Sequence, residues 1–234
     1  MNNNKKDKCV LLLDKNDFLA NAAEDYARSL YNVVYVVRSA RSDKKLPNEL
    51  LEIVSKGDVS YLFNFLSPLK IPIDVLDKIA IYSINFHPAS PEYPGVGCAS
   101  FPIFNKDKDY GVSAHIIEGE YDSGPIVETL YFPILEEEYC DNLFARALNF
   151  SLVLFYSVLL KISKGEEMLE TSEKWQRKSM TRTGFNAWMV LNPDDGEDIN
   201  LMKIRATQHI TFPGPFIELY GQRFELPPRK YMKS

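Results

Sequence analysis

The chain has 234 residues, of which 45% are apolar and 25% are charged. This length and composition predict a folded globular protein with a sizeable core and exclude a disordered chain. The formal net charge of -5 at pH 7 offers no overall basic character for binding a phosphate backbone, so we expect no nucleic-acid partner.

Cysteine spacing and the apolar runs indicate the compartment. Cys9, Cys98 and Cys140 are widely spaced and form no CxxC pair, which favours neither a disulfide framework nor a zinc site, and no metal ligand set is recognised. The apolar run near the start ends before Asp14, too early for a signal peptide, and no other run approaches a membrane span. We therefore expect a cytoplasmic protein with no membrane partner.

The first part of the chain alternates between predicted strands and helices. Continuous apolar runs predict strands at residues 9–13, 32–38 and 59–66. Helical spacing of apolar residues predicts a helix within 14–30, and a Pro and a Gly at its ends predict a second helix at 47–57. This alternation implies right-handed crossovers and a parallel sheet.

The middle of the chain continues the same unit. Residues 71–76 predict a turn or a short helix, and 80–86 predict a fourth strand. Two further strands are predicted at 111–119 and 124–134, separated by a turn. Residues 139–163 predict a long helix that is apolar on much of its circumference and therefore well packed.

The composition becomes polar and basic after residue 172. A helix with acidic residues at its start is predicted at 194–207, and a β-hairpin with Gly221 and Gln222 in its turn is predicted at 215–226. The apolar hairpin is expected to bury one face against a second subunit, giving a homodimer, or to pack on its own domain.

These elements predict an α/β fold with a Rossmann-like, mostly parallel sheet and a small C-terminal α+β appendage. We place the catalytic domain at residues 1–172 and the small domain, which ends in the hairpin, at residues 173–234.

The stretch SINFHP, where the fourth strand ends, carries the first candidate site residues. Asn85 and His87 are two residues apart, so their side chains point to the same side while the strand continues. Ligands bind at the carboxyl ends of strands in open α/β sheets. An amide donor beside an imidazole suits acyl transfer, which needs a donor for the developing oxyanion and a group that moves a proton. His115 and His209 lie where a hydrogen-bonded structural histidine is the usual interpretation.

Asp122 lies in the turn between the two following strands, within YDSGPI. A carboxylate near a histidine can orient it and favour its protonated form. Turns that contain Asp-Ser-Gly are common without any function, so this residue gains weight only from its combination with the other segments.

The ordered combination of NFHP, a loop with YPG, GVSAH and YDSGPI resembles the folate-dependent formyltransferases. The resemblance is strong over residues 59–133 and weak over the N-terminal strands. It implies that Asn85, His87 and Asp122 form the catalytic constellation. It also implies that N10-formyltetrahydrofolate is the co-substrate and that the acceptor is a free amine.

Within that family, the loop after NFHP and the segment FNFLSPLKIP are most similar to sugar N-formyltransferases. The purine enzyme carries a Gly-rich phosphate loop where this chain reads LLLDKND, and the transfer-RNA enzyme has a longer C-terminal domain. The resemblance therefore implies a nucleotide-linked amino sugar as acceptor, with dTDP-4-amino-4,6-dideoxyglucose favoured over GDP and UDP sugars. The product would serve O-antigen or other surface polysaccharide synthesis. A methionyl-tRNA formyltransferase is the alternative enzyme, and a pseudoenzyme that binds folate or nucleotide sugars is the non-enzyme alternative.

The resemblance also implies binding segments. Backbone groups of two segments would hold the pterin, and the residues concerned are Phe65, Leu66, Ser67, Ile117, Glu118 and Tyr121. Lys15 and Asn16 follow the first strand, where they would contact a diphosphate, or Asn16 or Asp17 would instead cap a helix. Tyr93 is expected to line the sugar site.

Aromatic residues and one cysteine leave alternatives open. Trp175, Trp188, Phe212 and Phe216 would stack on a base or form the core of the small unit. Cys98 lies near the expected site but lacks a separate histidine partner, so we interpret it as incidental.

Overall fold

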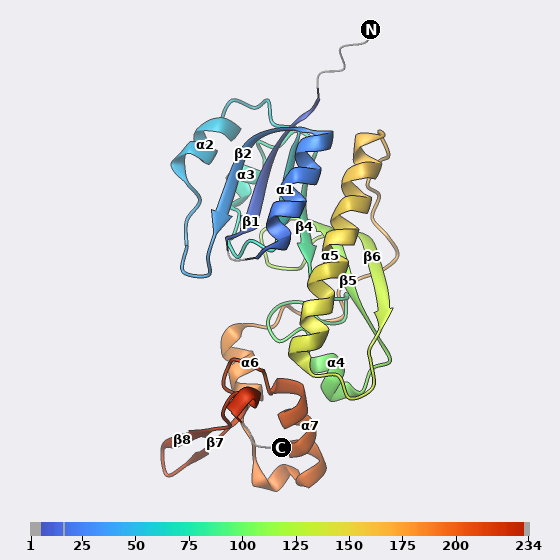
Figure 1. Cartoon of the computed structure of the whole chain (residues 1–234). Helices are drawn as coiled ribbons and strands as arrows, with labels where there is room; N and C mark the ends of the chain where they lie inside the picture. Colours follow the sequence, from blue (N-terminus) through green and yellow to red (C-terminus); the bar gives the residue numbers. More distant parts are fainter. Residues whose placement is uncertain (1–5, 16, 232–234) are drawn as a thin grey trace.

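A computed structural model describes residues 6–15 and 17–231, and its centre is a six-stranded sheet in the order β2-β1-β3-β4-β5-β6 (Figure 1). The strands are β1 (Lys8–Asp14), β2 (Asn32–Ser39), β3 (Tyr61–Phe65), β4 (Tyr82–His87), β5 (Asp109–Ile116) and β6 (Ile126–Pro133). The first four strands pair in parallel, whereas β5 is antiparallel to both β4 and β6. The predicted α/β fold with a mostly parallel sheet is confirmed.

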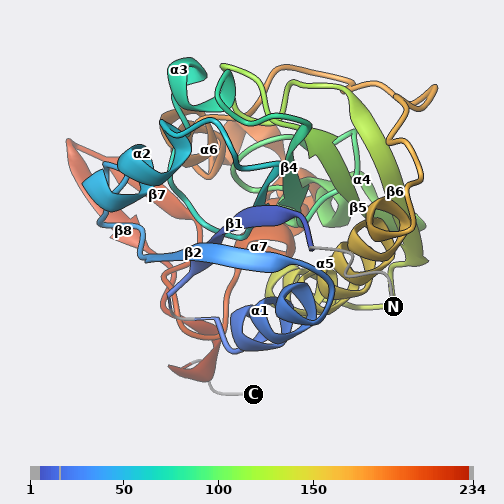
Figure 2. The ribbon, with the colours of Figure 1, turned by 90° about the horizontal axis from the view of Figure 1, so that it is seen from above.

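Helices cover both faces of the sheet, as the view from above shows (Figure 2). Helices α1 (Leu19–Leu30) and α5 (Cys140–Ser163) cover one face, and α2 (Asn48–Val54) and α3 (Ile73–Leu76) cover the other. Strand β1 is buried on both faces because its alternate residues enter the two cores: Cys9, Leu11 and Leu13 on the α5 side, and Val10 and Leu12 on the α2 side.

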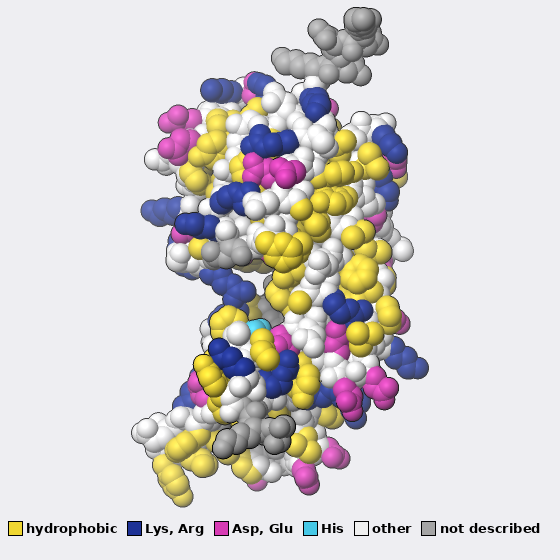
Figure 3. All heavy atoms as spheres, viewed as in Figure 1, with side chains coloured by type: hydrophobic (Ala, Val, Ile, Leu, Met, Phe, Trp, Pro, Cys, Tyr) yellow, Lys and Arg dark blue, Asp and Glu magenta, His cyan; other side chains and the backbone are white. Residues whose placement is uncertain are grey.

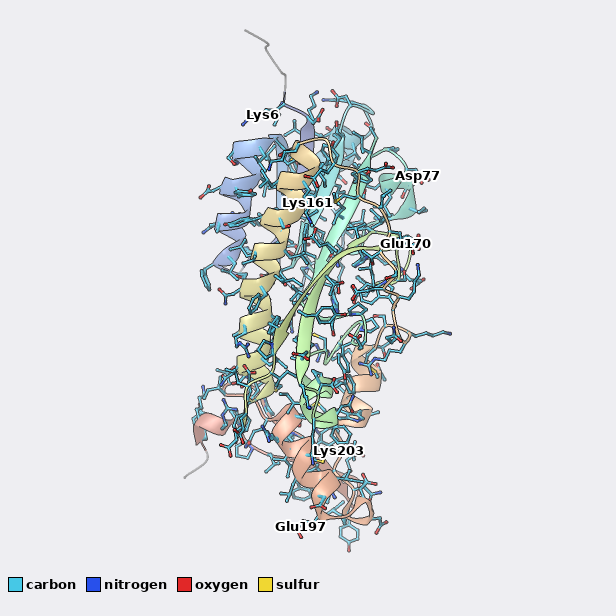
Figure 4. All side chains as sticks on the ribbon, turned by 90° about the vertical axis from the view of Figure 1, so that its right-hand side faces the viewer. Lys6, Asp77, Lys161, Glu170, Glu197 and Lys203 are labelled. Atoms are coloured by element: carbon cyan, nitrogen blue, oxygen red, sulfur yellow. The ribbon has the colours of Figure 1, made fainter. Side chains whose placement is uncertain are left out.

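Helix α5 is long and apolar enough, by length and composition, to cross a membrane, so the expectation that no segment approaches a span is wrong. Its 24 residues instead pack along the sheet beside α1, and Figure 4 shows Lys161 near one end of the helix. Fully buried Phe155 contacts the rings of Phe63 and Phe65 on β3 and of Phe86 on β4. Such a helix is accounted for by core packing. A cytoplasmic location stays a prediction.

The chain after α5 returns along the core before forming a C-terminal unit. The amide of Thr171 donates to the carbonyl of Ile126 at 2.8 Å, and the amide of Met180 donates to that of Pro94 at 3.0 Å. The unit then consists of α6 (Arg182–Trp188), a 3₁₀ turn (Pro193–Asp195), α7 (Glu197–Thr207), strands β7 (Phe216–Leu219) and β8 (Gln222–Glu225), and a second 3₁₀ turn (Arg229–Tyr231).

Helix α7 packs on α4 (Ser100–Asn105), the short helix after the loop that follows β4. In Figure 4, Glu197 and Lys203 of α7 lie at the opposite end of the molecule from Lys161. The sequence analysis did not predict α4 or α6, and the domain division after residue 172 stays a prediction.

The turn of the C-terminal hairpin differs from expectation by one residue. Tyr220 and Gly221 occupy it, with φ of 53° and 74°, while Gln222 already pairs with Leu219 as the first residue of β8. Two positive φ values in a two-residue loop match the twist of the flanking strands. The predicted turn pair of Gly221 and Gln222 is therefore wrong, because Tyr220 takes the first left-handed position.

Candidate active site

A cleft of about 1110 Å³ opens between the sheet and the C-terminal unit (Figure 3). Its floor lies where β3 and β4 end, and its walls include the turn after β5, the start of α5 and residues of α6 and β8. Asn85, His87, His115 and Asp122 all line it. The cleft therefore lies at the edge of the sheet that the sequence analysis identified, and it contains the three predicted catalytic side chains.

Asn85 is held by a histidine that the sequence analysis set aside. The antiparallel register pairs Asn85 of β4 with His115 of β5, and Asn85 Nδ2 lies 2.9 Å from His115 Nε2. His115 Nδ1 lies 2.8 Å from the carbonyl oxygen of Ile116, which can only accept, so this nitrogen carries a proton. Nε2 of the neutral ring then accepts from the Asn85 amide. Because that amide has two N–H donors, its second one remains for a ligand.

His115 had a signal in the sequence, since it is the histidine of the GVSAH segment that took part in the resemblance. The sequence analysis favoured a hydrogen-bonded structural role for it. The structure does show it hydrogen-bonded, but inside the candidate site, 3.5 Å from Asp122 Oδ1. The pairing of β4 with β5 makes it a neighbour of Asn85, and that register is not visible in the local sequence.

Asp122 connects the site residues. Its Oδ2 atom lies 3.4 Å from His87 Nδ1 and accepts the amide N–H of Gly95 at 2.9 Å. The side chain of Asp122 is only 11% exposed. A buried carboxylate is costly unless it is paired and hydrogen-bonded, and these contacts meet that requirement.

Both ring nitrogens of His87 face acceptors. His87 Nε2 lies 3.3 Å from the carbonyl oxygen of Tyr93, and Nδ1 faces the Asp122 carboxylate. A neutral imidazole has one N–H and can donate to only one of these partners, whereas an imidazolium donates to both. The two acceptors would therefore stabilise the imidazolium that forms if His87 accepts a proton during a reaction.

Burial opposes that charge in the resting protein. It lowers the pKa of His87 below the ordinary value of 6.5, although the charge of Asp122 and the carbonyl of Tyr93 act in the opposite direction. Burial alone would raise the pKa of Asp122, but a proton on His87 and the hydrogen bond from the Gly95 amide stabilise its carboxylate and lower that pKa. The ionised Asp122 carboxylate is therefore favoured near neutral pH, whereas burial favours the neutral imidazole of His87, which is able to accept a proton.

Trp175 covers the site from the segment that follows α5. Its indole N–H donates to the carbonyl of Gly124 at 2.8 Å, and its ring meets those of His87 and His115 edge-on, with centroids 5.9 and 5.1 Å away. The sequence analysis had offered base stacking or the core of the small unit for this residue. The structure places it against the catalytic core, just after the predicted domain division.

Two glycines allow the chain segments to approach closely enough to build the site. A Cβ at Gly124 would lie 2.1 Å from the carbonyl oxygen of Ile116. A Cβ at Gly95, whose φ is +86°, would lie 2.4 Å from backbone atoms of Met180. These positions admit only glycine without movement of the backbone around Asp122.

The two predicted folate segments lie at the cleft, except that the side chain of Phe65 does not line it. Leu66, Ser67 and the segment 117–121 line it. The ring of Phe65 is fully buried and packs in the core against Phe86 and Phe155, so only its backbone is available at the strand end. Their role in binding stays a prediction.

The predicted acceptor residues are placed differently. Lys15 is exposed and is not among the residues that line the cleft, and Asn16 lies outside the described residues. The ring of Tyr93 is 6% exposed, its hydroxyl donates to Asp107, and it packs beside Phe101, away from the cleft. The expectation that the Tyr93 side chain lines the sugar site is therefore wrong, because tertiary packing turns the ring into the core.

The cleft offers neither a reactive thiolate nor, among the described residues, a metal-binding cluster. Cys98 lines the cleft, but burial raises the pKa of its thiol to about 11, which disfavours the nucleophilic thiolate. Among the residues that the structure describes, no group of three or more His, Cys, Asp or Glu side chains is arranged to hold a metal ion.

Comparison with known proteins agrees with this geometry. The profile of the family described as "Formyl transferase" matches residues 5–159. The chain is 26% identical over 163 residues to a methionyl-tRNA formyltransferase of Levilactobacillus brevis, covering 67% of this chain and 49% of that protein. It is 24% identical over 138 residues to a GDP-perosamine N-formyltransferase of Brucella melitensis, covering 58% of this chain and 51% of that protein. The chain thus spans about half the length of the curated relatives it matches.

Solved structures show the same fold. A sugar N-formyltransferase from Shewanella sp. FDAARGOS_354 superposes with a TM-score of 0.76 at 20% identity, covering 94% of this chain and 96% of that one. An N-formyltransferase from Helicobacter canadensis, solved with folinic acid and dTDP-3-aminofucose, gives a TM-score of 0.62 at 16% identity over 92% of this chain and 85% of that one.

The opposition between burial and charge at His87 can be tested directly. Replacing Asp122 by Asn should lower the pKa of His87 further, because the carboxylate charge is what raises it against burial. The imidazole would then be protonated only at a lower pH than in the wild type. Titration of the imidazole NMR signals measures this, with His209→Gln as a control that leaves the His87 signal unchanged. A higher pKa in the Asn variant would contradict the electrostatic account.

Proposed function

The chain belongs to the formyl transferase family, and we propose on that premise that it transfers the formyl group of N10-formyltetrahydrofolate to the amine of a nucleotide-linked amino sugar. The observation that carries the proposal is the convergence of Asn85, His87 and Asp122 on the floor of one cleft. That cleft is large enough for a folate and a second substrate.

The folate is proposed to bind along Leu66, Ser67 and the segment 117–121. Lys70 also lines this side of the cleft, where its ammonium lies 5.7 Å from the centroid of the Tyr121 ring and 3.9 Å from Glu120 Oε1. The family membership and the folinic acid in the Helicobacter canadensis structure support a folate donor. The folate would supply the activated formyl group, and the side chains of this protein would orient it and move the protons.

The chemistry assigns each residue a step. The neutral amine attacks the formyl carbon, the carbonyl oxygen becomes an oxyanion, and the remaining N–H of Asn85 donates to it. His87 accepts the proton that the amine loses, and Asp122 together with the Tyr93 carbonyl stabilises the imidazolium. The oxyanion then re-forms the carbonyl, the bond from the formyl carbon to N10 breaks, and the proton held by His87 passes to N10, with Asp122 assisting, as tetrahydrofolate leaves.

The acceptor is proposed to be dTDP-4-amino-4,6-dideoxyglucose, with a role in O-antigen or other surface polysaccharide synthesis. The sugar N-formyltransferases among the relatives and the net charge of -5 support a nucleotide sugar over a nucleic acid. The second candidate is formylation of methionyl-tRNA. The identity of 26% to a methionyl-tRNA formyltransferase is the observation that favours it.

A homodimer through the C-terminal hairpin completes the proposal. The register of β7 and β8 puts Ile217, Leu219 and Phe224 on one face and Phe216 on the other. Phe216 is buried, whereas Leu219 and Phe224 are 45% and 56% exposed. The hairpin projects from the body of the molecule in Figure 1, so its apolar outer face is available to a second copy.

Sedimentation velocity tests the dimer. The wild type should sediment as a dimer, and the double variant Leu219→Ser, Phe224→Ser should shift toward monomer because it removes the apolar face. Val153→Ser is a matched control, since Val153 is 54% exposed on α5 and far from the hairpin in sequence. A wild-type monomer at all concentrations would reject the assembly.

The catalytic roles predict large losses of turnover. Asn85→Ala should lower kcat by about 100- to 1000-fold, as removal of an oxyanion donor does, and His87→Asn by about 100- to 10,000-fold. Asp122→Asn should also lower kcat by orders of magnitude, and the effects should not add because the groups act together. Steady-state release of tetrahydrofolate measures each rate. Asn149→Ala, on α5 outside the cleft, is the control with unchanged turnover, and near-wild-type activity of any site variant would remove that residue from the mechanism.

A substrate panel tests the function itself. Incubation with N10-formyltetrahydrofolate and dTDP-, GDP- and UDP-linked amino sugars should yield one product heavier by a formyl group, detected by mass spectrometry. Formylation of the dTDP sugar alone is the expected result. Formylation of a GDP or UDP sugar instead would correct the nucleotide. Formylation of methionyl-tRNA without any sugar product would overturn the substrate class.

A further inference from the structure

Two arginines line the cleft without a carboxylate partner. Arg41 comes from the loop between β2 and α2, and Arg182 is the first residue of α6, so they approach from different parts of the chain. Both are exposed, and among the described residues neither forms an ion pair or a hydrogen bond with an acidic side chain. The pKa of Arg182 is lowered chiefly by the burial of part of its side chain and in addition by the positive charge of Arg41.

Several acidic side chains of the cleft are engaged by other groups. Asp141 binds Arg229 at 3.0 Å, and Glu225 binds Arg223. Asp122 belongs to the catalytic cluster. The remaining carboxylates that line the cleft are Asp14, Asp17, Glu118 and Glu120, of which Asp17 accepts the amide of Leu19 and Glu120 lies near Lys70. The guanidinium groups of Arg41 and Arg182 line the same cleft, and two positive charges in one cleft favour an anion that binds both.

An exposed aromatic ring lies in the same cleft. Phe212 lines it and is 64% exposed, with the ring of His209 on one side at a centroid distance of 4.7 Å. The other three aromatic residues considered for base stacking, Trp175, Trp188 and Phe216, do not line the cleft. Trp188 packs on Phe101 and Phe104, and Phe216 is buried. Phe212 is therefore the one of the four with a ring surface open to a ligand in the cleft.

We propose that Arg41 and Arg182 bind the diphosphate of the acceptor and that Phe212 stacks on its base, so that the nucleoside diphosphate bridges the core and the C-terminal unit. The guanidinium fork matches phosphate oxygens in pairs, and two arginines suit the two phosphates of a diphosphate. Stacking on an aromatic ring is tolerant of base identity because every base has a π face. Figure 3 shows Lys and Arg side chains both above and below the hollow.

This inference rests on the proposed function, because it assigns the binding place of the proposed acceptor. It places the phosphate contacts elsewhere than the sequence-based expectation of Lys15 did, since Arg41 and Arg182 line the cleft and Lys15 does not. A ligand held by both arginines would reach from the loop after β2 to α6. The amino sugar at the other end of the diphosphate would then extend toward the cluster of Asn85 and His87 on the floor.

Isothermal titration calorimetry on the full chain tests the assignment, with dTDP, GDP, UDP and inorganic pyrophosphate as probes. Arg41→Gln and Arg182→Gln should each weaken binding of the preferred nucleotide at least about tenfold and should weaken pyrophosphate as well. Phe212→Ala should weaken the nucleotide but leave pyrophosphate unchanged, since pyrophosphate has no base. Arg205→Gln is the matched control, because Arg205 is an exposed arginine of α7 that does not line the cleft. All variants should bind folinic acid as the wild type does.

The possible failures are distinguishable. If the wild type binds a nucleotide and the Arg41 and Arg182 variants bind it equally well, the diphosphate assignment is overturned while the proposed function stands. If Phe212→Ala weakens pyrophosphate as much as nucleotide, the stacking assignment is overturned. A variant that loses folinic acid together with the nucleotide overturns the assignment of a separate subsite. If the wild type binds none of the three nucleotides, the proposed acceptor class fails and the subsite fails with it.

Discussion

The buried carboxylate of Asp122 is the group around which the candidate site is built. It faces His87 of β4, His115 of β5 and the backbone amide of Gly95, so it joins three segments that are separate in the sequence. An uncompensated charge at this depth would destabilise the fold, and its partners are therefore held close to it. The same contacts pair the buried charge of Asp122 and position His87. The local fold and the proposed chemistry therefore depend on the same side chains.

The backbone around this carboxylate adopts an uncommon conformation. Asp122 has a φ of 47°, and Leu66, across the cleft, has a φ of 64°. Left-handed conformations of residues other than glycine cost of the order of 1–3 kcal/mol and persist where the surroundings enforce them. Here the enforcement comes from the pairing of β5 with β6 and from the contact of Gly124 with the Ile116 carbonyl. Two segments that line the cleft thus each contain a left-handed residue other than glycine.

The change from parallel to antiparallel pairing between β4 and β5 brings the parts of the site together. In that register His115 lies opposite Asn85, and the turn that follows β5 carries Asp122 back to His87. The C-terminal unit adds a wall of the cleft, and Trp175 of the returning segment packs against His87 and His115. Because function resides in sites added to a fold, a shared core with a different appended wall offers a physical route from one transfer chemistry to different acceptors.

The sequence by itself determined the strands, the main helices and three of the site residues, because those depend on local properties of the chain. Apolar runs and helical periodicity are short-range patterns, and NFHP and YDSGPI each lie within a few residues. Only the tertiary structure decided the place of His115 beside Asn85, the burial of the Tyr93 ring and the contact of Trp175 with both histidines. Each of these depends on strand register or on packing between distant segments, where the energy of a buried side chain outweighs local preference, and no single stretch of sequence encodes such a contact.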